Sequence, residues 1–141
     1  MIYRSKAPLR IGLAGGGTDV SPYCDLYGGA ILNAAISLYA TASIEPNEEN
    51  SIILHAVDRK DEEHFEWNKE LPIDGKNDLL KGVYNRVQKD YNLNVRGFKL
   101  STYVDAPAGS GLGTSSTLVV AILGAFAEML KLQLSEYELA H

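Results

Sequence analysis

A glycine-rich stretch followed by three hydroxyl side chains, PAGSGLGTSS at residues 107–116, carries residue types that bind phosphate. Glycines let the backbone approach a ligand closely and adopt positive φ angles. The apolar run after the hydroxyls predicts a long helix over Thr114–Lys131. A helix start exposes unpaired backbone N–H groups and the positive end of the helix dipole, so a glycine loop at this place predicts a phosphate cradle.

The spacing of the loop excludes the two commonest nucleotide-binding motifs. No lysine follows the last glycine, as G-x-x-x-x-G-K-S/T requires, and glycines at 109, 111 and 113 do not match G-x-G-x-x-G. The hydroxyls of Thr114, Ser115 and Ser116 can cap the helix or ligate magnesium, which favours oxygen ligands. The alternative interpretation is a tight turn in front of a capped, buried helix.

The elements that position this loop follow from the hydrophobic periodicity. Alternation and β-branched residues predict strands over 2–13 (broken near Pro8), 30–46, 51–57, 62–68 and 97–105. Helical spacing predicts an amphipathic helix over 76–91, and glycine-rich residues 15–29 predict a turn with a short helix from about Ser21. This order predicts an α+β fold with a mixed or largely antiparallel sheet and helices packed on it, not a doubly wound fold.

The composition excludes several classes of protein. The chain has 141 residues, enough for one domain and one core, and its net charge of −5 argues against a nucleic-acid-binding surface. A single cysteine, Cys24, permits no internal disulfide, and no apolar run is long enough to span a bilayer. We therefore expect a cytoplasmic protein with neither a membrane nor a nucleic acid as partner. The acidic run Asp58, Asp61, Glu62 and Glu63 is interpreted as a solvated turn.

The glycine-rich stretch resembles the P-x-x-x-G-L-G-S-S-A motif of the GHMP kinases, a family in which this loop wraps the ATP phosphates. The matching positions are Pro107, Gly111, Leu112, Gly113 and Ser115. Thr114 and Ser116 depart from the motif, but Thr114 keeps a hydroxyl and Ser116 stays small. Neither change threatens phosphate binding.

A second stretch, APLRIGLAGGGTD at residues 7–19, resembles the sugar-kinase pattern A-P-x-R-x-x-x-x-G-x-x-T-D of the same family. It is similar to the branch with heptose-phosphate kinases and fucose kinases, because Gly16-Gly17 stands where galactokinases have Glu-His. A buried Asp19 carboxylate can accept hydrogen bonds from two sugar hydroxyls, and Arg10 can offset charge near the transferred phosphoryl group. The alternatives are an Asp19 that caps the following helix, an Arg10 on a strand surface, and glycines that form only a turn.

The resemblance implies the N-terminal domain of a GHMP kinase, a two-layer fold also seen in ribosomal proteins, and an enzyme that uses ATP and Mg²⁺. It implies that Arg10 is catalytic and that the sugar-binding residues are Gly16, Gly17, Thr18 and Asp19. It further implies that the ATP phosphates are surrounded by Pro107, Gly109, Ser110, Gly111, Leu112, Gly113, Thr114 and Ser115. The Ser115 hydroxyl would be the Mg²⁺ ligand.

The implied reaction is transfer of the ATP γ-phosphate to a sugar hydroxyl. The branch favours the anomeric hydroxyl of D-glycero-D-manno-heptose 7-phosphate as the acceptor. A fucose or galactose kinase is the alternative within the family, and a non-catalytic nucleotide-binding module or an RNA-binding domain are alternatives of other classes. A homodimer is compatible with this interpretation.

The last residues predict a further helix, because Ser135 and Glu138 stand at capping-box spacing. We expect residues 1–141 to be the ATP-binding N-terminal domain of a longer kinase, truncated before its C-terminal domain. In the family, a magnesium-binding glutamate and a catalytic aspartate follow the long helix, and residues 117–141 are too few to include them. We therefore expect that this chain alone does not turn over.

Overall fold

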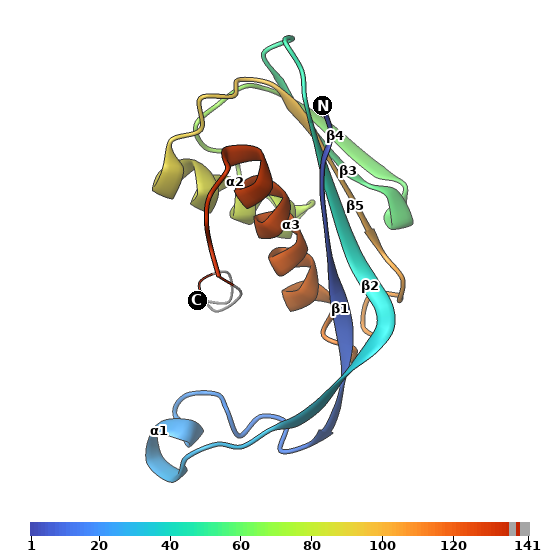
Figure 1. Ribbon diagram of the computed structural model, residues 1–141, viewed down its shortest axis with the longest axis vertical. Helices are drawn as coiled ribbons and strands as arrows, with labels where there is room; N and C mark the ends of the chain where they lie inside the picture. Colours follow the sequence, from blue (N-terminus) through green and yellow to red (C-terminus); the bar gives the residue numbers. More distant parts are fainter. Residues whose placement is uncertain (136–137, 139–141) are drawn as a thin grey trace.

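The computed structural model describes residues 1–135 and 138, and a five-stranded mixed sheet forms its centre (Figure 1). The strands are β1 (Tyr3–Ala14), β2 (Leu32–Pro46), β3 (Ser51–Ala56), β4 (Asp61–Glu66) and β5 (Phe98–Val104), in the spatial order β1-β2-β5-β3-β4. Neighbouring strands are antiparallel except β3 and β5, which are parallel. The predicted α+β fold with a mixed sheet is confirmed.

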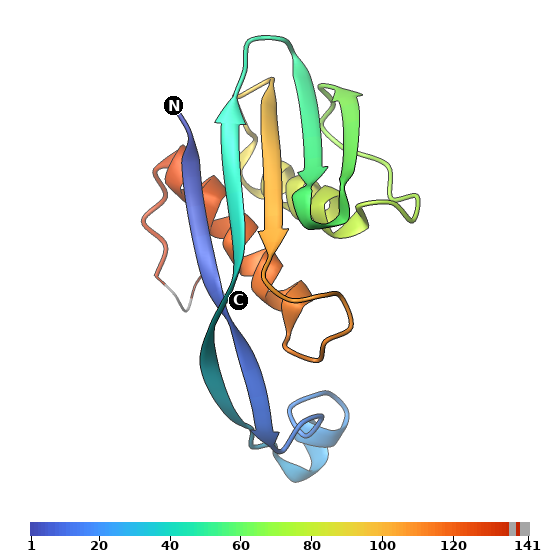
Figure 2. The same ribbon diagram turned by 90° about the vertical axis from the view of Figure 1, so that its right-hand side faces the viewer.

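Two long helices, α2 (Asp78–Tyr91) and α3 (Thr114–Leu130), cover one face of this sheet (Figure 1, Figure 2). Helix α2 buries an amphipathic face at the spacing that predicted it, with Leu80, Val83, Tyr84 and Val87. Helix α3 is apolar on most sides because it packs on β1, β2 and α2 together.

Two shorter helical segments lie within residues 1–135, the continuous stretch that the structure describes. The predicted short helix is α1 (Tyr23–Tyr27), and a single 3₁₀ turn, η1 (Val57–Arg59), joins β3 to β4. Beyond α3, the predicted capping box forms: the Ser135 N–H and hydroxyl donate to Glu138 Oε2 at 2.8 and 2.7 Å. Among the residues that the structure describes, no helix has the length and apolar character that crossing a bilayer requires.

Strands β1 and β2 continue past the rest of the sheet as a two-stranded arm, residues 10–35, with α1 at its tip (Figure 2). The register of the pair shifts at the base of the arm, where Pro8 lies opposite Tyr39 but Arg10 lies opposite Ala35. Such an irregularity bends a strand pair and increases its twist. The predicted break near Pro8 is therefore a bend within one continuous strand, and the arm curves toward the helix side of the sheet (Figure 1).

Helix α3 lies close to strand β1 at Gly124. A Cβ atom built on Gly124 would lie 3.1 Å from the Cβ of Ser5, and closer still to its Oγ. By contrast, a Cβ atom built on Gly82 in α2 would meet nothing within 4 Å. The glycine in α3 therefore permits close packing of helix on sheet, whereas the glycine in α2 does not serve packing.

We expect Gly124→Ala to lower the free energy of unfolding by about 1 kcal/mol, because overpacking against Ser5 outweighs the gain in helix propensity. The matched control Gly82→Ala should raise it by about 0.5–1 kcal/mol, since propensity improves without a clash. Urea unfolding of both variants measures the difference. Equal stabilisation by the two substitutions would contradict the close approach of α3 to β1.

Candidate functional site

The glycine loop, residues 105–113, is fastened at both ends to the β1–β2 pair. At its start, the Asp105 N–H donates to the Tyr39 carbonyl (2.9 Å), and Asp105 Oδ2 accepts from the Tyr39 N–H (2.8 Å). At its end, the Arg10 N–H donates to the Leu112 carbonyl (3.2 Å). The loop is thereby held against the two strands that also form the arm.

The backbone of the loop has the conformation of an anion-binding nest. Positive φ angles recur at every second residue, 79° at Gly109, 75° at Gly111 and 71° at Gly113. Gly113 is also the N-cap of α3, and no side chain in the described part of the chain caps this helix. The first-turn N–H groups therefore have no side-chain cap among the described residues, which contradicts the cap that the alternative of a tight turn before a capped helix assumed.

The Arg10 side chain lies along the start of α3, so the structure brings the two sequence motifs together. A Cβ atom built on Gly113 would lie 3.2 Å from Nε and 3.4 Å from Cγ of Arg10. Across the arm, Arg10 Nη1 donates to Asn33 Oδ1 at 3.0 Å, which holds the guanidinium in place. Arg10 is exposed, but these contacts distinguish it from an ordinary surface residue of a strand.

At the tip of the arm, Thr18 holds the glycine turn together. Its hydroxyl donates to the Gly15 carbonyl (2.7 Å) and accepts from the Ala30 N–H (3.1 Å). A side chain at Gly15 or Gly29 would overlap the backbone on the opposite side of the turn, so the two sides pack directly on each other. The Thr18 hydroxyl, predicted to bind a sugar, is engaged within the arm.

Three other predicted residues, Gly16, Gly17 and Asp19, are exposed at this tip, so the expectation of a buried Asp19 is wrong. A Cβ atom on either glycine would meet nothing within 4 Å, which leaves space beside the backbone. Asp19 does not cap α1, because the N-cap is Pro22 and makes no side-chain capping bond. The carboxylate of Asp19 is therefore available to a ligand rather than committed to the helix.

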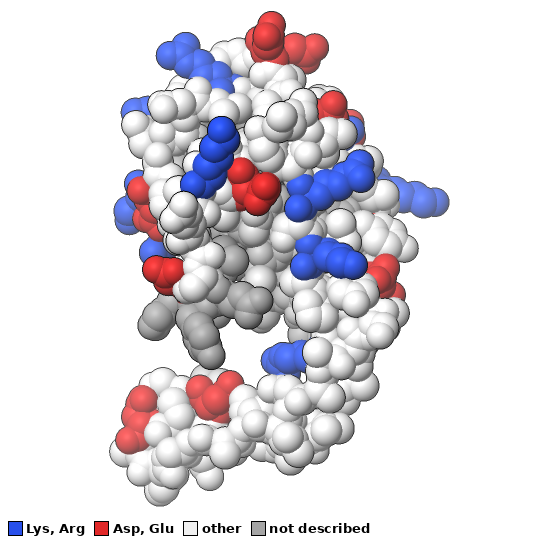
Figure 3. Space-filling view, viewed as in Figure 1, with Lys and Arg blue, Asp and Glu red and all other residues white. Residues whose placement is uncertain are grey.

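The arm and the body of the molecule border a common hollow (Figure 3). The arm curves under the N-terminal end of α3 (Figure 1), and acidic side chains mark its outer part. Between residues 11 and 44 the only charged residues are Asp19 and Asp25. An anionic group bound at the tip would therefore accept hydrogen bonds from backbone N–H groups, since the tip has no Lys or Arg side chain.

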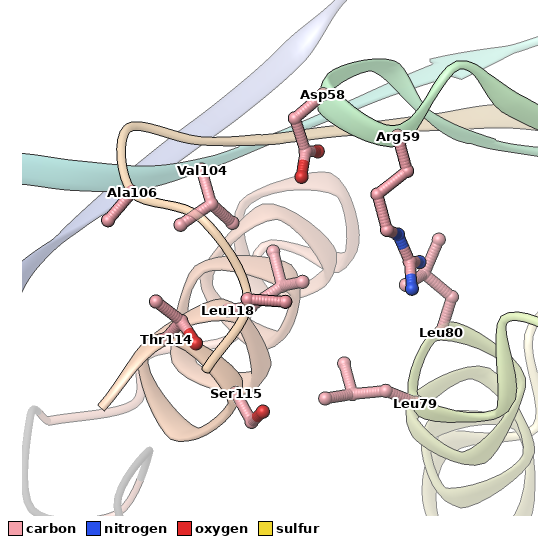
Figure 4. Close-up of a pocket in the computed structure, with 10 residues that line it drawn as sticks. Asp58, Arg59, Leu79, Leu80, Val104, Ala106, Thr114, Ser115 and Leu118 are labelled. Atoms are coloured by element: carbon pink, nitrogen blue, oxygen red, sulfur yellow. The ribbon is translucent and has the colours of Figure 1, made fainter. Parts of the chain in front are cut away.

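A pocket opens beside the first turn of α3, where four elements meet (Figure 4). Its walls come from η1, the start of α2, the end of β5 with the loop, and α3: Asp58, Arg59, Leu79, Leu80, Val104, Ala106, Ala108, Thr114, Ser115 and Leu118. Apolar walls with a few polar groups are typical of small-molecule sites. No local pattern in the sequence indicates that Asp58, Arg59, Leu79 and Leu80 meet α3, so these residues were not predicted for the site.

A polar network stands behind this pocket. The Asn77 amide donates to Asp61 Oδ2 (3.0 Å) and Glu63 Oε2 (2.7 Å), and its carbonyl accepts from Arg59 Nη2 (2.8 Å). Lys81, whose side chain is 0% exposed, lies 3.4 Å from Glu63. The interpretation of the acidic run as a solvated turn is wrong for Asp61 and Glu63, since strand alternation turns both toward α2.

Hydrogen bonds between Lys81 and its carboxylate partners favour the charged forms of Lys81 and Asp74. Burial opposes the Lys81 charge, but hydrogen bonds to Asp74 and Glu63 outweigh it and leave the Lys81 pKa above its usual value. The hydrogen bond from Lys81 likewise lowers the pKa of Asp74. On the opposite face of β4, hydrogen bonds from Lys99 and then His64 lower the pKa of Glu62 to about 2.

A protein-only metal site is not found among the described residues, which contain no group of three His, Cys, Asp or Glu side chains able to hold a metal ion. The exposed Ser115 hydroxyl beside the pocket is nevertheless a suitable single oxygen ligand. Mg²⁺ at nucleotide sites keeps waters and phosphate oxygens as most of its ligands, so one hydroxyl fits this role.

The chain is similar to known kinases over most of its length. The family described as GHMP kinases N terminal domain matches residues 78–141. The chain is 50% identical over 137 residues to the D-glycero-alpha-D-manno-heptose 7-phosphate kinase of Campylobacter jejuni, covering 97% of this chain and 40% of that protein. It is 30% identical over 142 residues to the L-fucokinase/L-fucose-1-P guanylyltransferase of Bacteroides fragilis, covering 85% of this chain and 15% of that protein.

A crystal structure of a D-glycero-D-manno-heptose 1-phosphate kinase from Bacteroides thetaiotaomicron has the same fold, with a TM-score of 0.91 at 56% identity. That match covers 99% of this chain and 45% of the other. The chain thus has the fold of the N-terminal domain of these kinases, with a glycine loop at a helix start beside an arginine and an apolar pocket. The chain belongs to the GHMP kinases, and it spans less than half the length of the two heptose-phosphate kinases it matches.

We expect Lys81→Ala to lower the free energy of unfolding by about 3 kcal/mol, because Glu63 would be left largely buried without its cation. Lys76→Ala removes an ion pair that Lys76, 55% exposed, makes with Asp61, and should change stability by less than about 1 kcal/mol. Urea unfolding at neutral pH compares the variants. A Lys81→Ala effect as small as that of the control would show that the cluster does not stabilise the fold.

Proposed function

We propose that this chain is the nucleotide-binding N-terminal domain of an ATP-dependent sugar kinase that phosphorylates the anomeric hydroxyl of D-glycero-D-manno-heptose 7-phosphate. The observation that carries this proposal is the contact of Arg10, in the sugar-side motif, with Gly113, in the phosphate-side motif. The name of the Campylobacter jejuni relative, a heptose 7-phosphate kinase at 50% identity, supports the acceptor.

The phosphate end of ATP would lie on the glycine loop. The nest formed by Gly109, Gly111 and Gly113, with the first-turn N–H groups of α3, offers donors to phosphate oxygens. The Ser115 hydroxyl would be a ligand of Mg²⁺, and bound Mg²⁺ neutralises charge on the transferred phosphoryl group. Arg10 lies beside the same helix start and would stabilise that charge from the β1 side.

The nucleoside end of ATP would enter the pocket beside the loop. Thr114 and Ser115 line this pocket and also open α3, so a ligand with phosphates on the loop has the pocket next to it (Figure 4). Leu79 and Leu118 offer apolar surface to a flat base, while Asp58 and Arg59 supply polar groups.

The sugar would lie at the tip of the arm. Asp19 is exposed there and would accept hydrogen bonds from sugar hydroxyls, which fixes the hydroxyl presented to ATP. The open backbone at Gly16 and Gly17 would donate to the 7-phosphate. A fucose kinase is the second candidate, favoured by the 30% identity to the Bacteroides fragilis fucokinase.

The carboxylate that completes the magnesium site and the base for the sugar hydroxyl would come from a further domain. The two heptose-phosphate kinases have more than half of their length outside the matched segment, which supports this division. The domain alone should therefore bind Mg·ATP without transferring phosphate. We propose the cytoplasm as its location, because the kinase draws on ATP there and its one cysteine forms no internal disulfide.

We expect Ser115→Ala to weaken Mg·ATP binding by this chain about tenfold, because a ligand to the metal is lost. Ser116→Ala is the matched control, since Ser116 is exposed on the same helical turn but does not line the pocket. Isothermal titration with Mg²⁺ and with EDTA measures both variants. A Ser115→Ala loss that persists without Mg²⁺ would contradict the metal role.

We expect the longer polypeptide that contains this chain to phosphorylate the heptose 7-phosphate and neither fucose nor galactose. Arg10→Ala should lower its kcat about 100-fold through lost transition-state stabilisation, whereas Arg4→Ala on the same strand should not. A ³¹P NMR assay shows which hydroxyl receives the phosphate. Transfer to fucose but not to the heptose phosphate would overturn the proposed acceptor.

A further inference from the structure

Asn77 is only 5% exposed, and both the nitrogen and the oxygen of its side-chain amide make hydrogen bonds. Both amide hydrogens face carboxylates, of Asp61 and of Glu63, and the amide oxygen faces the Arg59 guanidinium. The residue has a φ of 48°, in the left-handed region, where asparagine, aspartate and glycine are tolerated best. Aspartate at this position would repel the two carboxylates, and glycine would lack the hydrogen bonds. Asparagine therefore satisfies both the backbone conformation and the side-chain contacts.

The Asn77 amide lies between the Arg59 guanidinium and two carboxylates, those of Asp61 and Glu63. Without the amide, the guanidinium and the carboxylates would be free to form ion pairs. A guanidinium beside two carboxylates forms bidentate ion pairs readily. Here the carboxylates are compensated by lysines instead, Asp61 by Lys76 at 3.2 Å and Glu63 by Lys81 at 3.4 Å. Among the described residues, Arg59 therefore makes no ion pair, and its charge is left for the pocket that it lines.

The geometry of Arg59 suits a contact with the nucleoside end of a nucleotide. Figure 4 shows its side chain extending from η1 toward Leu79 and Leu80, across the pocket from Thr114 and Ser115. One terminal nitrogen, Nη2, is engaged by Asn77, so the planar face and the donors on Nη1 and Nε remain. A planar cation can stack on a base or donate to its ring nitrogens.

We propose that Arg59 contacts the base of the bound nucleotide, and that Asn77 is a positioning residue that holds Arg59 at the pocket and away from Asp61 and Glu63. This inference rests on the proposed nucleotide-binding function. It assigns a specificity role to a residue outside both sequence motifs. It also gives the acidic residues of β4 a part in the site, since they anchor the Asn77 amide.

The test uses Arg59→Ala, Asn77→Gly and the double variant in the 141-residue chain. Glycine at 77 keeps the positive φ without strain while removing the amide. Titration calorimetry gives the Kd for Mg·ATP and for Mg·tripolyphosphate, which lacks a base, and thermal melting shows that each variant is folded. Arg86→Ala removes an arginine that is 74% exposed and lines no part of the pocket, so it is the matched control.

Arg59→Ala should weaken ATP binding about tenfold and leave tripolyphosphate binding unchanged, since only the base contact is lost. Asn77→Gly should weaken ATP binding by a similar factor in the wild-type background and not at all in the Arg59→Ala background. Arg59→Lys should recover part of the affinity, because the charge returns without the planar group. Arg86→Ala should bind both ligands as the wild type does.

Four outcomes would overturn the inference or a part of it. If Arg59→Ala binds ATP as the wild type does, the base contact is wrong while the proposed function stands. If Asn77→Gly weakens ATP binding equally in both backgrounds, Asn77 does not act through Arg59. If the wild-type chain binds tripolyphosphate but gains nothing from the base, the pocket is not a nucleoside site, and if it binds neither ligand, the proposed function fails as well.

Discussion

The hydrogen bonds that fasten the glycine loop to β1 and β2 are the constraint on which the rest of the site depends. A loop with three glycines loses much conformational entropy when it is ordered, so it holds one shape only if other contacts fix it. The paired bonds of Asp105 with Tyr39 fix its start, and the bond between Arg10 and Leu112 fixes its end. The bond between Arg10 and Leu112 also places the Arg10 side chain at the start of α3.

This arrangement explains how an acidic chain can offer an anion site. A net charge of −5 does not attract phosphate, so the attraction has to be local. The positive end of α3 and the backbone nest provide it at the loop. On the far side of the pocket, Lys76 and Lys81 compensate the nearby carboxylates, and Arg59 keeps an unpaired charge within the described residues.

The two halves of the site lie on different parts of the fold. The proposed nucleotide side belongs to the body, where α2, α3 and the sheet pack around one core, and its shape depends on that packing. The proposed sugar side belongs to the arm, which is held mainly by the pairing of β1 with β2 and by Thr18 at its tip. In our proposal, differences at the tip can change the acceptor without disturbing the nucleotide site, as the Gly16-Gly17 pair illustrates.

The sequence alone determined which elements form and which family the chain resembles. Hydrophobic periodicity is local, so it predicted the strands, both long helices and α1, and the motif spacing predicted the family. The mixed character of the sheet was predicted only as one option, because strand pairing depends on partners far apart in the chain.

Only the tertiary structure decided how distant residues meet. It placed Arg10 beside Gly113, bent β1 at Pro8 into an arm, and assembled the pocket from four elements. It also turned Asp61 and Glu63 from an expected solvated run into partners of a buried lysine and an amide. The physical reason is that the sequence shows where a carboxylate stands in the chain but not whether it is buried or what it pairs with. Its burial and its partners exist only once strand β4 packs against α2.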